Sequence, residues 1–171
     1  MRGRCRVERT VRVQVRHRTP DILERVENSN EFVELLARAS RPLPRAVLLK
    51  TAQAVQGQFV EGDLKAASVA CALRTSSGHI YTGVNMDLTC GIGFCAEHSA
   101  VARMLEARET RIEAIVAVWD NGHIFPPCGR CREMLLQVNA ANVGTRVLLA
   151  PLEVRTLAEL MPFRWQDYRG W

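Results

Sequence analysis

Cys95-Ala96-Glu97 and Pro127-Cys128-Gly129-Arg130-Cys131 are the two stretches of this sequence that decide its fold and its chemistry. A Cys-x-x-Cys pair brings two thiolates together at the start of a helix, and Cys95 supplies a third thiolate from a distant segment. Three protein ligands leave a tetrahedral zinc ion with one open position. Structural zinc sites normally close that position with protein, whereas catalytic sites leave it to water. The spacing therefore predicts a catalytic zinc site.

The sequence around these stretches alternates between helix and strand. Apolar residues at helical spacing predict a helix over residues 95–108, and a second helix covers residues 128–138. Between them, Ile112–Trp119 is a run of Ile, Val and Ala with the length of a buried strand. Both metal-binding stretches begin helices, where unpaired N–H groups and the positive end of the helix dipole stabilise thiolate anions.

A hairpin and a helix precede the first metal-binding stretch. Residues 67–73 and 79–84 flank Thr75-Ser76-Ser77-Gly78, which predicts a hairpin with a glycine-containing turn. Residues 45–56 predict a helix that ends at Gly57.

The C-terminal part adds one more strand and a short helix. Residues 146–149 predict the strand, and residues 156–161 the helix, in which Thr156 and Glu159 complete a capping box. The order of elements predicts an α/β fold, a three-layer α-β-α sandwich. Its mixed sheet of about five strands would carry helices on both faces.

Residues 1–43 are expected to be a basic N-terminal extension with one helix, and residues 44–171 a single catalytic domain. Valines between residues 11 and 15 alternate with polar residues, which is compatible with an edge strand or with a disordered arm. Ser29-Asn30 can cap a helix that extends to Ala39.

The net charge of +5 is placed unevenly. Residues 1–45 hold eleven Arg against six acidic residues, whereas residues 46–171 hold twelve basic and twelve acidic residues. A basic tail can bind nucleic acid, but it is more often a solvated extension, and the neutral body favours a small-molecule substrate. No apolar run approaches the ~20 residues of a membrane span, and the N-terminus lacks the apolar stretch of a signal peptide.

The six cysteines are not spread as in a small secreted disulfide scaffold. Three belong to the metal motif, which favours a reducing, cytoplasmic compartment. Cys71 is interpreted as a buried apolar residue and Cys90 as a loop thiol. His123 is a candidate fourth ligand, but the turn Asn121-Gly122 favours an exposed side chain for it.

Cys-Ala-Glu followed by Pro-Cys-Gly-x-Cys-Arg resembles the three-cysteine branch of the zinc-dependent cytidine deaminases. The sequence is similar both to the small tetrameric cytidine deaminases and to blasticidin-S deaminase. Thr82-Gly83-Val84-Asn85 and Glu159-Leu160-Met161-Pro162 also carry the resemblance, which covers roughly Pro44 to the C-terminus. It implies a catalytic zinc ion in each subunit of a homotetramer. Its ligands would be Cys95, Cys128 and Cys131.

Glu97 is the expected acid and base of the reaction. A carboxylate two residues after a zinc ligand can take a proton from water, pass it to ring nitrogen N3, and then to the departing ammonia. Three thiolates give the zinc site a net charge of about −1, which a cation should offset. The resemblance assigns this role to Arg132, which would hydrogen-bond the sulfurs. The second such arginine of the family is replaced by His98, for which simple packing on the helix is the alternative.

The resemblance also implies substrate contacts. Cytidine deaminases bind the ribose hydroxyls through an Asn-x-Glu segment, and Asn85-Met86-Asp87 is similar, with a shorter acid. For Asn85, a plain turn residue is the alternative. Ala96 is assigned to the substrate site as well. The family's early aromatic residue is missing around residues 66–69, so Phe163 or Trp165 is expected to form an aromatic wall, in the family at a neighbouring subunit's site. Interface packing is the alternative for both.

We therefore expect hydrolytic deamination of cytidine or deoxycytidine, in nucleoside metabolism and pyrimidine salvage. The first alternative is a deaminase of a cytosine-nucleoside antibiotic such as blasticidin S, or of another aminated heterocycle. Blasticidin-S deaminase replaces the acid found here at Asp87, so its retention favours an ordinary nucleoside. A remote alternative is a zinc-stabilised nucleic-acid-binding protein, which would need a fourth protein ligand and salt-sensitive binding. Neither nucleic acid nor a membrane is an expected partner.

Overall fold

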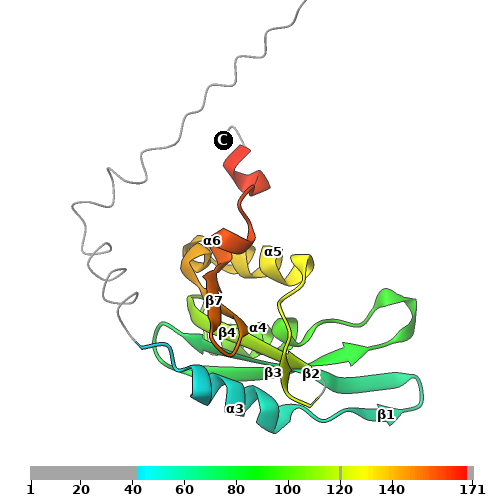
Figure 1. Ribbon diagram of the computed structural model, residues 1–171. Coiled ribbons are helices and arrows are strands. Elements are labelled where there is room, and N and C mark those ends of the chain that lie inside the picture. The colour runs from blue at the N-terminus through cyan, green and yellow to red at the C-terminus, as the bar shows by residue number, and fades with distance from the viewer. Residues whose placement is uncertain (1–41, 120, 169–171) are drawn as a thin grey trace, which may run out of the picture. The chain divides into compact units, whose positions relative to one another are not determined.

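The computed structural model describes residues 42–119 and 121–168 (Figure 1). These residues form one mixed sheet with helices on both of its faces. The strands are β1 (Phe59–Glu61), β2 (Leu64–Thr75), β3 (Ile80–Asp87), β4 (Ile112–Trp119), β5 (His123–Ile124), β6 (Arg146–Ala150) and β7 (Glu153–Thr156). The α-helices are α3 (Arg45–Val55), α4 (Ala96–Glu106), α5 (Gly129–Val138) and α6 (Leu157–Leu160), and the 3-10 helices are η1 (Thr89–Gly91), η2 (Ala140–Gly144) and η3 (Trp165–Tyr168).

Strand β2 organises the sheet. It pairs antiparallel with β1, β3 and β4, and β4 in turn pairs parallel with β6. Strands β5 and β7 add antiparallel edges to β4 and β6. A parallel pair of strands needs a crossover connection, and here α5 lies in the connection between β4 and β6.

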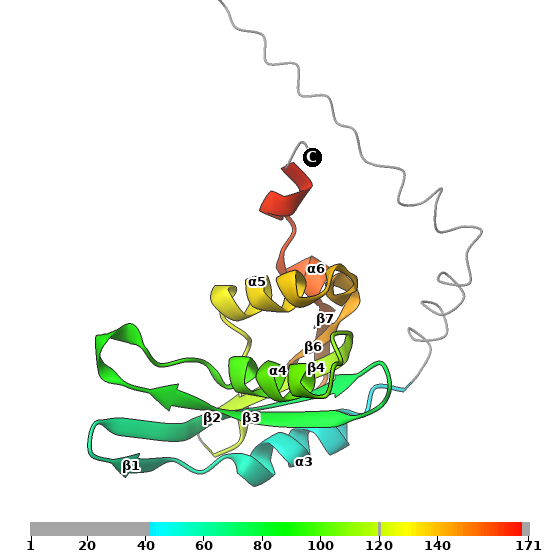
Figure 2. The ribbon, with the colours of Figure 1, turned by 180° about the vertical axis from the view of Figure 1, so that it is seen from behind.

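Successive side chains of β2 and β4 serve two separate cores, because strand side chains alternate between faces. Cys71 and Ile115 pack with α4 and α5 on one face. Ala72 and Val116 pack with α3 on the other face. Figure 2 shows α3 on one side of the sheet and α4 and α5 on the other, which confirms the three-layer prediction.

The sheet has seven strands within the described residues, rather than about five. The additional strands β1, β5 and β7 are two to four residues long, too short to give a recognisable hydrophobic period. The capping box at the start of α6 is confirmed, with Thr156 and Glu159 in the predicted roles. The helix predicted after Ser29-Asn30 and the alternating valines lie outside the described residues, so the division at residue 43 stays a prediction.

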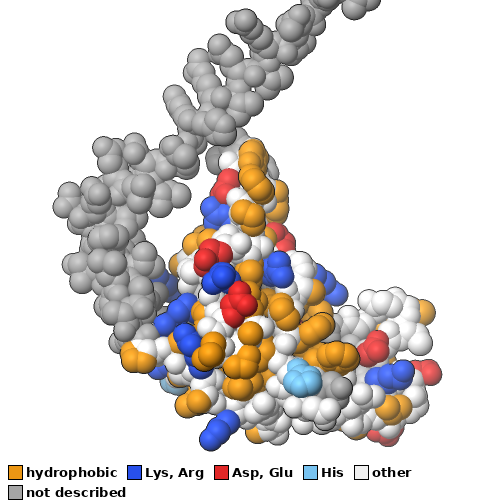
Figure 3. Space-filling view, viewed as in Figure 1, with side chains coloured by type: hydrophobic (Ala, Val, Ile, Leu, Met, Phe, Trp, Pro, Cys, Tyr) orange, Lys and Arg blue, Asp and Glu red, His pale blue; other side chains and the backbone are white. Residues whose placement is uncertain are grey.

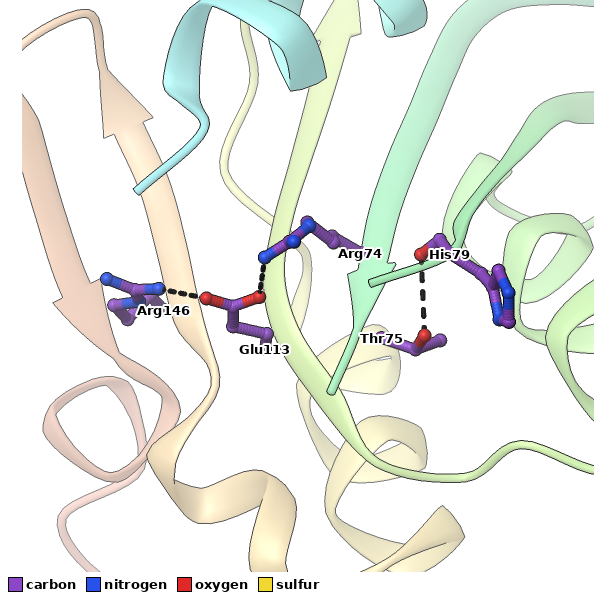
Figure 4. Close-up of polar contacts among 5 residues, drawn as sticks. All are labelled: Arg74, Thr75, His79, Glu113 and Arg146. Carbon is purple, nitrogen blue, oxygen red and sulfur yellow. Dashed lines mark hydrogen bonds and ion pairs between the residues drawn. The ribbon is translucent and has the colours of Figure 1, made fainter. Parts of the chain in front are cut away.

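A bulge at the start of β4 turns Glu113 toward two arginines. The pairing shifts between Arg74 with Ala114 and Thr75 with Ile112, which leaves Glu113 without a strand partner. Its buried carboxylate bonds to Arg74 of β2 and Arg146 of β6 (Figure 4). Because charge-assisted bonds of this kind are directional, the cluster fixes the register of three neighbouring strands.

No helix in residues 42–119 and 121–168 has both the length and the apolar character to cross a membrane.

Candidate active site

Three thiols converge where α4 and α5 begin. Cys95 and Cys128 are the N-cap residues of the two helices, both with extended backbone, and Cys131 lies in the first turn of α5. The sulfur atoms of Cys95 and Cys128 are 3.8 Å apart, and those of Cys128 and Cys131 are 3.5 Å apart. Zinc–sulfur bonds of about 2.3 Å place two thiolates of a tetrahedron about 3.8 Å apart. The spacing of the sulfurs therefore fits zinc.

The electrostatics of the three thiols also call for a cation. Burial raises the pKa of the Cys95 and Cys131 thiols, and the nearby Glu97 carboxylate raises that of Cys131 further. At Cys128 partial burial acts against ionisation, but hydrogen bonds from Cys131 and Cys95 dominate and lower the pKa. Collecting three thiolates beside a carboxylate is unfavourable without a metal ion, so zinc binding must drive the loss of their protons.

The metal cluster of the described residues consists of these three cysteines, whose ligand atoms lie within 4.8 Å of one another. His123 belongs to β5 and is exposed, as the turn before it predicted. Three protein ligands leave a tetrahedral ion with one open position.

Glu97 lies in the first turn of α4, with only 4% of its surface exposed. Burial raises the pKa of its carboxyl group, although a backbone hydrogen bond opposes the shift. A carboxyl group whose pKa is moved toward neutrality is suited to accept a proton and give it up again.

Gly83 of β3 allows α4 to approach the sheet closely enough to carry these residues. A Cβ at this position would lie 2.2 Å from the Ala100 nitrogen and 2.6 Å from the Ala96 oxygen, both backbone atoms of α4. Ser99 of the same helix donates from its hydroxyl to the Val84 carbonyl at 2.9 Å. The helix that bears Glu97 is therefore held against β3 by a close backbone contact that only glycine permits.

A cavity of about 310 Å³ opens beside the thiols. Its wall includes Cys95, Glu97 and Cys128 from the metal centre, and Asn85 and Asp87 from the end of β3. The structure thus brings two of the predicted substrate contacts to the predicted catalytic residue. A volume of this order suits a small-molecule ligand.

His98 lies beside the metal centre, with Nδ1 3.7 Å from the Cys131 sulfur. Partial burial and then the charge of Arg130 lower the pKa of His98. An uncharged imidazole can still donate one hydrogen bond to a thiolate. Arg130 also lines the cavity, a role that sequence reasoning missed although the residue stands between two ligands of the motif.

Arg132 has different partners from those expected. Its Nε donates to the Pro127 carbonyl at 2.8 Å, and its Nη1 donates to the Leu160 carbonyl at 3.3 Å. The guanidinium group therefore holds the peptide before Cys128 against the C-terminal helix α6. Its expected contact with the sulfurs stays a prediction.

The aromatic residues of the cavity are Phe94 and Phe125, which sequence reasoning missed because both lie in loops. Phe163 is 83% exposed, and Trp165 donates from Nε1 to Glu133 on α5 at 2.6 Å. Neither lines the cavity of its own chain. The predicted contact with a neighbouring subunit's site stays a prediction.

Ala96 is fully buried in the core that α4 forms with the sheet. Its side chain is not part of the cavity wall. The assigned substrate contact also stays a prediction.

A three-thiolate metal site with an open position beside a buried carboxylate is typical of zinc hydrolases, which activate water for attack on small molecules. This is the class of protein that the sandwich and its cavity define. A family model described as the cytidine and deoxycytidylate deaminase zinc-binding region matches residues 45–146. The chain belongs to this family, and it is an enzyme with a zinc cofactor.

This chain is also similar to known cytidine deaminases over most of their length. The chain is 30% identical over 112 residues to a cytidine deaminase of Mycobacterium tuberculosis, covering 64% of this chain and 80% of the relative. A cytidine deaminase of Halalkalibacterium halodurans is 30% identical over 126 residues, which cover 70% and 92% of the two chains. The crystal structure of cytidine deaminase from Mycobacterium leprae superposes with a TM-score of 0.61 at 27% identity, covering 71% of this chain and 100% of that one.

Proposed function

We propose that this enzyme hydrolyses the amino group of cytidine or deoxycytidine, giving the uracil nucleoside and ammonia. The observation that carries the proposal is the position of buried Glu97 in the wall of a cavity that two of the three metal-site thiols also line. The relatives named cytidine deaminase support the substrate class.

Glu97 is the proton carrier in this proposal. Cys95, Cys128 and Cys131 would hold the zinc ion, which would supply the Lewis acid that lowers the pKa of water toward neutrality. The carboxylate of Glu97 takes a proton from the attacking water and delivers it to N3 of the ring, which makes C4 electrophilic. Glu97 then transfers the second proton of the water to the amino group, which leaves as ammonia while the C4 carbonyl forms.

Asn85 and Asp87 are proposed to bind the sugar. Both line the cavity, and they are separated by one residue on β3, so their side chains lie on the same side of the strand. An ionised carboxylate has acceptor sites for two hydroxyl protons. Asp87 is exposed and therefore accessible to a ribose.

The test is a screen for released ammonia with cytidine, deoxycytidine, cytosine, blasticidin S, adenosine and guanine, with zinc determined in the same sample. Cytidine or deoxycytidine should react fastest, with about one zinc ion per chain. A zinc-loaded sample that leaves every compound unchanged contradicts the proposal. Ammonia from blasticidin S alone assigns the enzyme to antibiotic inactivation instead.

The proposal extends to assembly as a homotetramer. The C-terminal segment exposes Phe163, Trp165 and Tyr168 at 83%, 45% and 75%, and Figure 3 shows hydrophobic side chains gathered on it. Exposed aromatic side chains in one segment suit contact with another copy of the chain. Light scattering of the purified protein tests this assembly.

A role in pyrimidine salvage within the cytoplasm is also part of the proposal. The five cysteines of the described residues are free thiols, and three of them must stay reduced to bind zinc. Residues 1–43 are proposed to be an extension that catalysis does not require. Removal of these residues should leave kcat for cytidine unchanged.

A further inference from the structure

The open end of the β2–β3 hairpin carries a bulge beside the cavity. Ala66 pairs with Met86 and the next pair is Ala70 with Val84, so residues 67–69 oppose Asn85 alone. A bulge of this kind bends the strand and redirects its groups.

The bulge begins with a strained residue. Ala67 is 5% exposed and has a φ of 58°, which is unfavourable for a residue with a Cβ. Such strain persists only where the surrounding structure holds it, and it is typical of functional sites.

The bulge aims two donors at one atom. The Val69 backbone N–H donates to Oδ1 of Asn85 at 2.8 Å, and the Ser68 hydroxyl donates to the same oxygen at 3.2 Å. Because a backbone N–H can only donate, the oxygen of the amide must be the atom that faces β2. The contact with the Val69 N–H therefore assigns which end of the Asn85 amide is oxygen and which is nitrogen.

Nδ2 of Asn85 is consequently the polar atom left for the cavity, whose wall Asn85 forms in part. Among the described residues, no hydrogen-bond partner occupies this nitrogen. An amide nitrogen offers two donors and no acceptor, whereas the carboxylate oxygens of Asp87 offer acceptors. A hydroxyl group, which both accepts and donates, is the ligand group that this pair matches.

We infer that Ser68, which follows the left-handed Ala67, is a positioning residue. Together with the Val69 N–H it holds the Asn85 amide with its NH2 group toward the cavity, and so it strengthens recognition of the sugar hydroxyls. Ser68 does not line the cavity and therefore acts through Asn85. The inference rests on the proposed function, and it explains how Asn85 of the sugar subsite is held in position.

The first test compares cytidine with 2′,3′-dideoxycytidine in Ser68→Ala, Ser68→Thr and the unaltered enzyme. Loss of one of the two bonds to Oδ1 should lower kcat/KM for cytidine about fivefold to tenfold, mainly through KM. The effect on the dideoxy substrate should be at most about twofold, because it lacks the hydroxyls that the amide would bind. Ser68→Thr keeps the hydroxyl and should restore most of the loss.

Ser77→Ala is the matched control, because it removes an exposed hydroxyl from the turn of the same hairpin. Its ratio of kcat/KM between the two substrates should equal that of the unaltered enzyme. An equal loss for both substrates in Ser68→Ala, or no loss for either, overturns the positioning role. If the unaltered enzyme releases no ammonia from cytidine, the proposed function fails first.

A second test reverses the polarity of the amide. Asn85→Asp keeps an acceptor for the Val69 N–H and Ser68 hydroxyl, so the fold should hold, but it removes the donors from the cavity. We expect kcat/KM for cytidine to fall about 100-fold, with a melting temperature close to that of the unaltered enzyme. Activity within about threefold of the unaltered enzyme would show that no donor at this position faces the sugar.

Discussion

The two ends of the β2–β3 hairpin use similar hydrogen bonds for different purposes. At the turn, Glu109 bonds to the Tyr81 hydroxyl at 2.8 Å and to the His79 ring at 2.6 Å. At the open end, Asn85 accepts from Ser68 and a neighbouring backbone N–H. Each end therefore gathers donors from β2, β3 or their turn on a single polar side chain.

The difference lies in what remains unsatisfied. Hydrogen bonds from Thr75, and further ones from Tyr81, His79 and Ser77, lower the pKa of Glu109 to about 2, so the turn is stabilised by the charged carboxylate. The Thr75 hydroxyl has one proton, and its alternative acceptor is the His79 carbonyl at 3.4 Å (Figure 4). The open end instead keeps a strained residue and an amide nitrogen that has no hydrogen-bond partner in the described part of the chain. The hydrogen bonds at the turn stabilise the fold. The strain and the unsatisfied amide nitrogen at the open end lower its stability, as is common at ligand-binding sites.

The largest effect should come from Glu97→Gln, at the cavity beside the open end of the hairpin. This change should affect catalysis but not stability. An amide cannot carry the proton, so kcat for cytidine should fall by roughly 10³-fold or more. Zinc content and melting temperature should stay near those of the unaltered enzyme. Turnover within tenfold of the unaltered enzyme would remove Glu97 from the mechanism.

Gly83→Ala should be the most destabilising change along the hairpin, because it separates the middle of β3 from α4. The added Cβ meets backbone atoms that cannot rotate away, and we expect a loss of about 3 kcal/mol in urea denaturation. Gly57→Ala is a suitable control, since a Cβ there has nothing within 4 Å. Equal stability of both variants would contradict the close approach of α4.

Acid should weaken the turn of the hairpin. The folded pKa of Glu109, about 2, lies below its ordinary value of 4.5, so the stabilisation is complete above pH 4.5 and is lost as pH falls toward 2. The melting temperature should therefore drop over this interval. In Glu109→Gln the drop should be smaller, and melting curves at several pH values measure it. An identical pH dependence in both proteins would exclude Glu109 as a source.

The smallest effect concerns two alanines of β2 changed to glycine. Ala67→Gly relieves a left-handed conformation, so stability should stay the same or rise by up to about 1 kcal/mol. Ala72→Gly, in regular buried strand, should lose about 1 kcal/mol. Chemical denaturation compares them directly. Equal losses in the two variants would show that Ala67 is not strained.

Elements with a strong local signal were predictable from sequence. The apolar run of β4, the helices after Cys95 and Cys128, and the Thr156 capping box are each specified by nearby residues. The gathering of Cys95, Cys128 and Cys131 followed from the motif, because the chemistry of zinc restricts the arrangement of its ligands.

Features that depend on contacts between distant segments were not predictable. The bulge at Ala67 has no sequence signal, because alanine does not favour positive φ. The partners of Arg132 depend on where α6 lies. Phe94 and Phe125 reach the cavity from loops whose paths are set by tertiary packing.

The most direct test of the account is a crystal structure of the zinc-loaded enzyme without substrate. We predict zinc bound by the sulfurs of Cys95, Cys128 and Cys131, with a solvent molecule as the fourth ligand within hydrogen-bond distance of Glu97. A fourth protein ligand, such as the ring of His98, or a Glu97 carboxylate directed away from the metal, would contradict it.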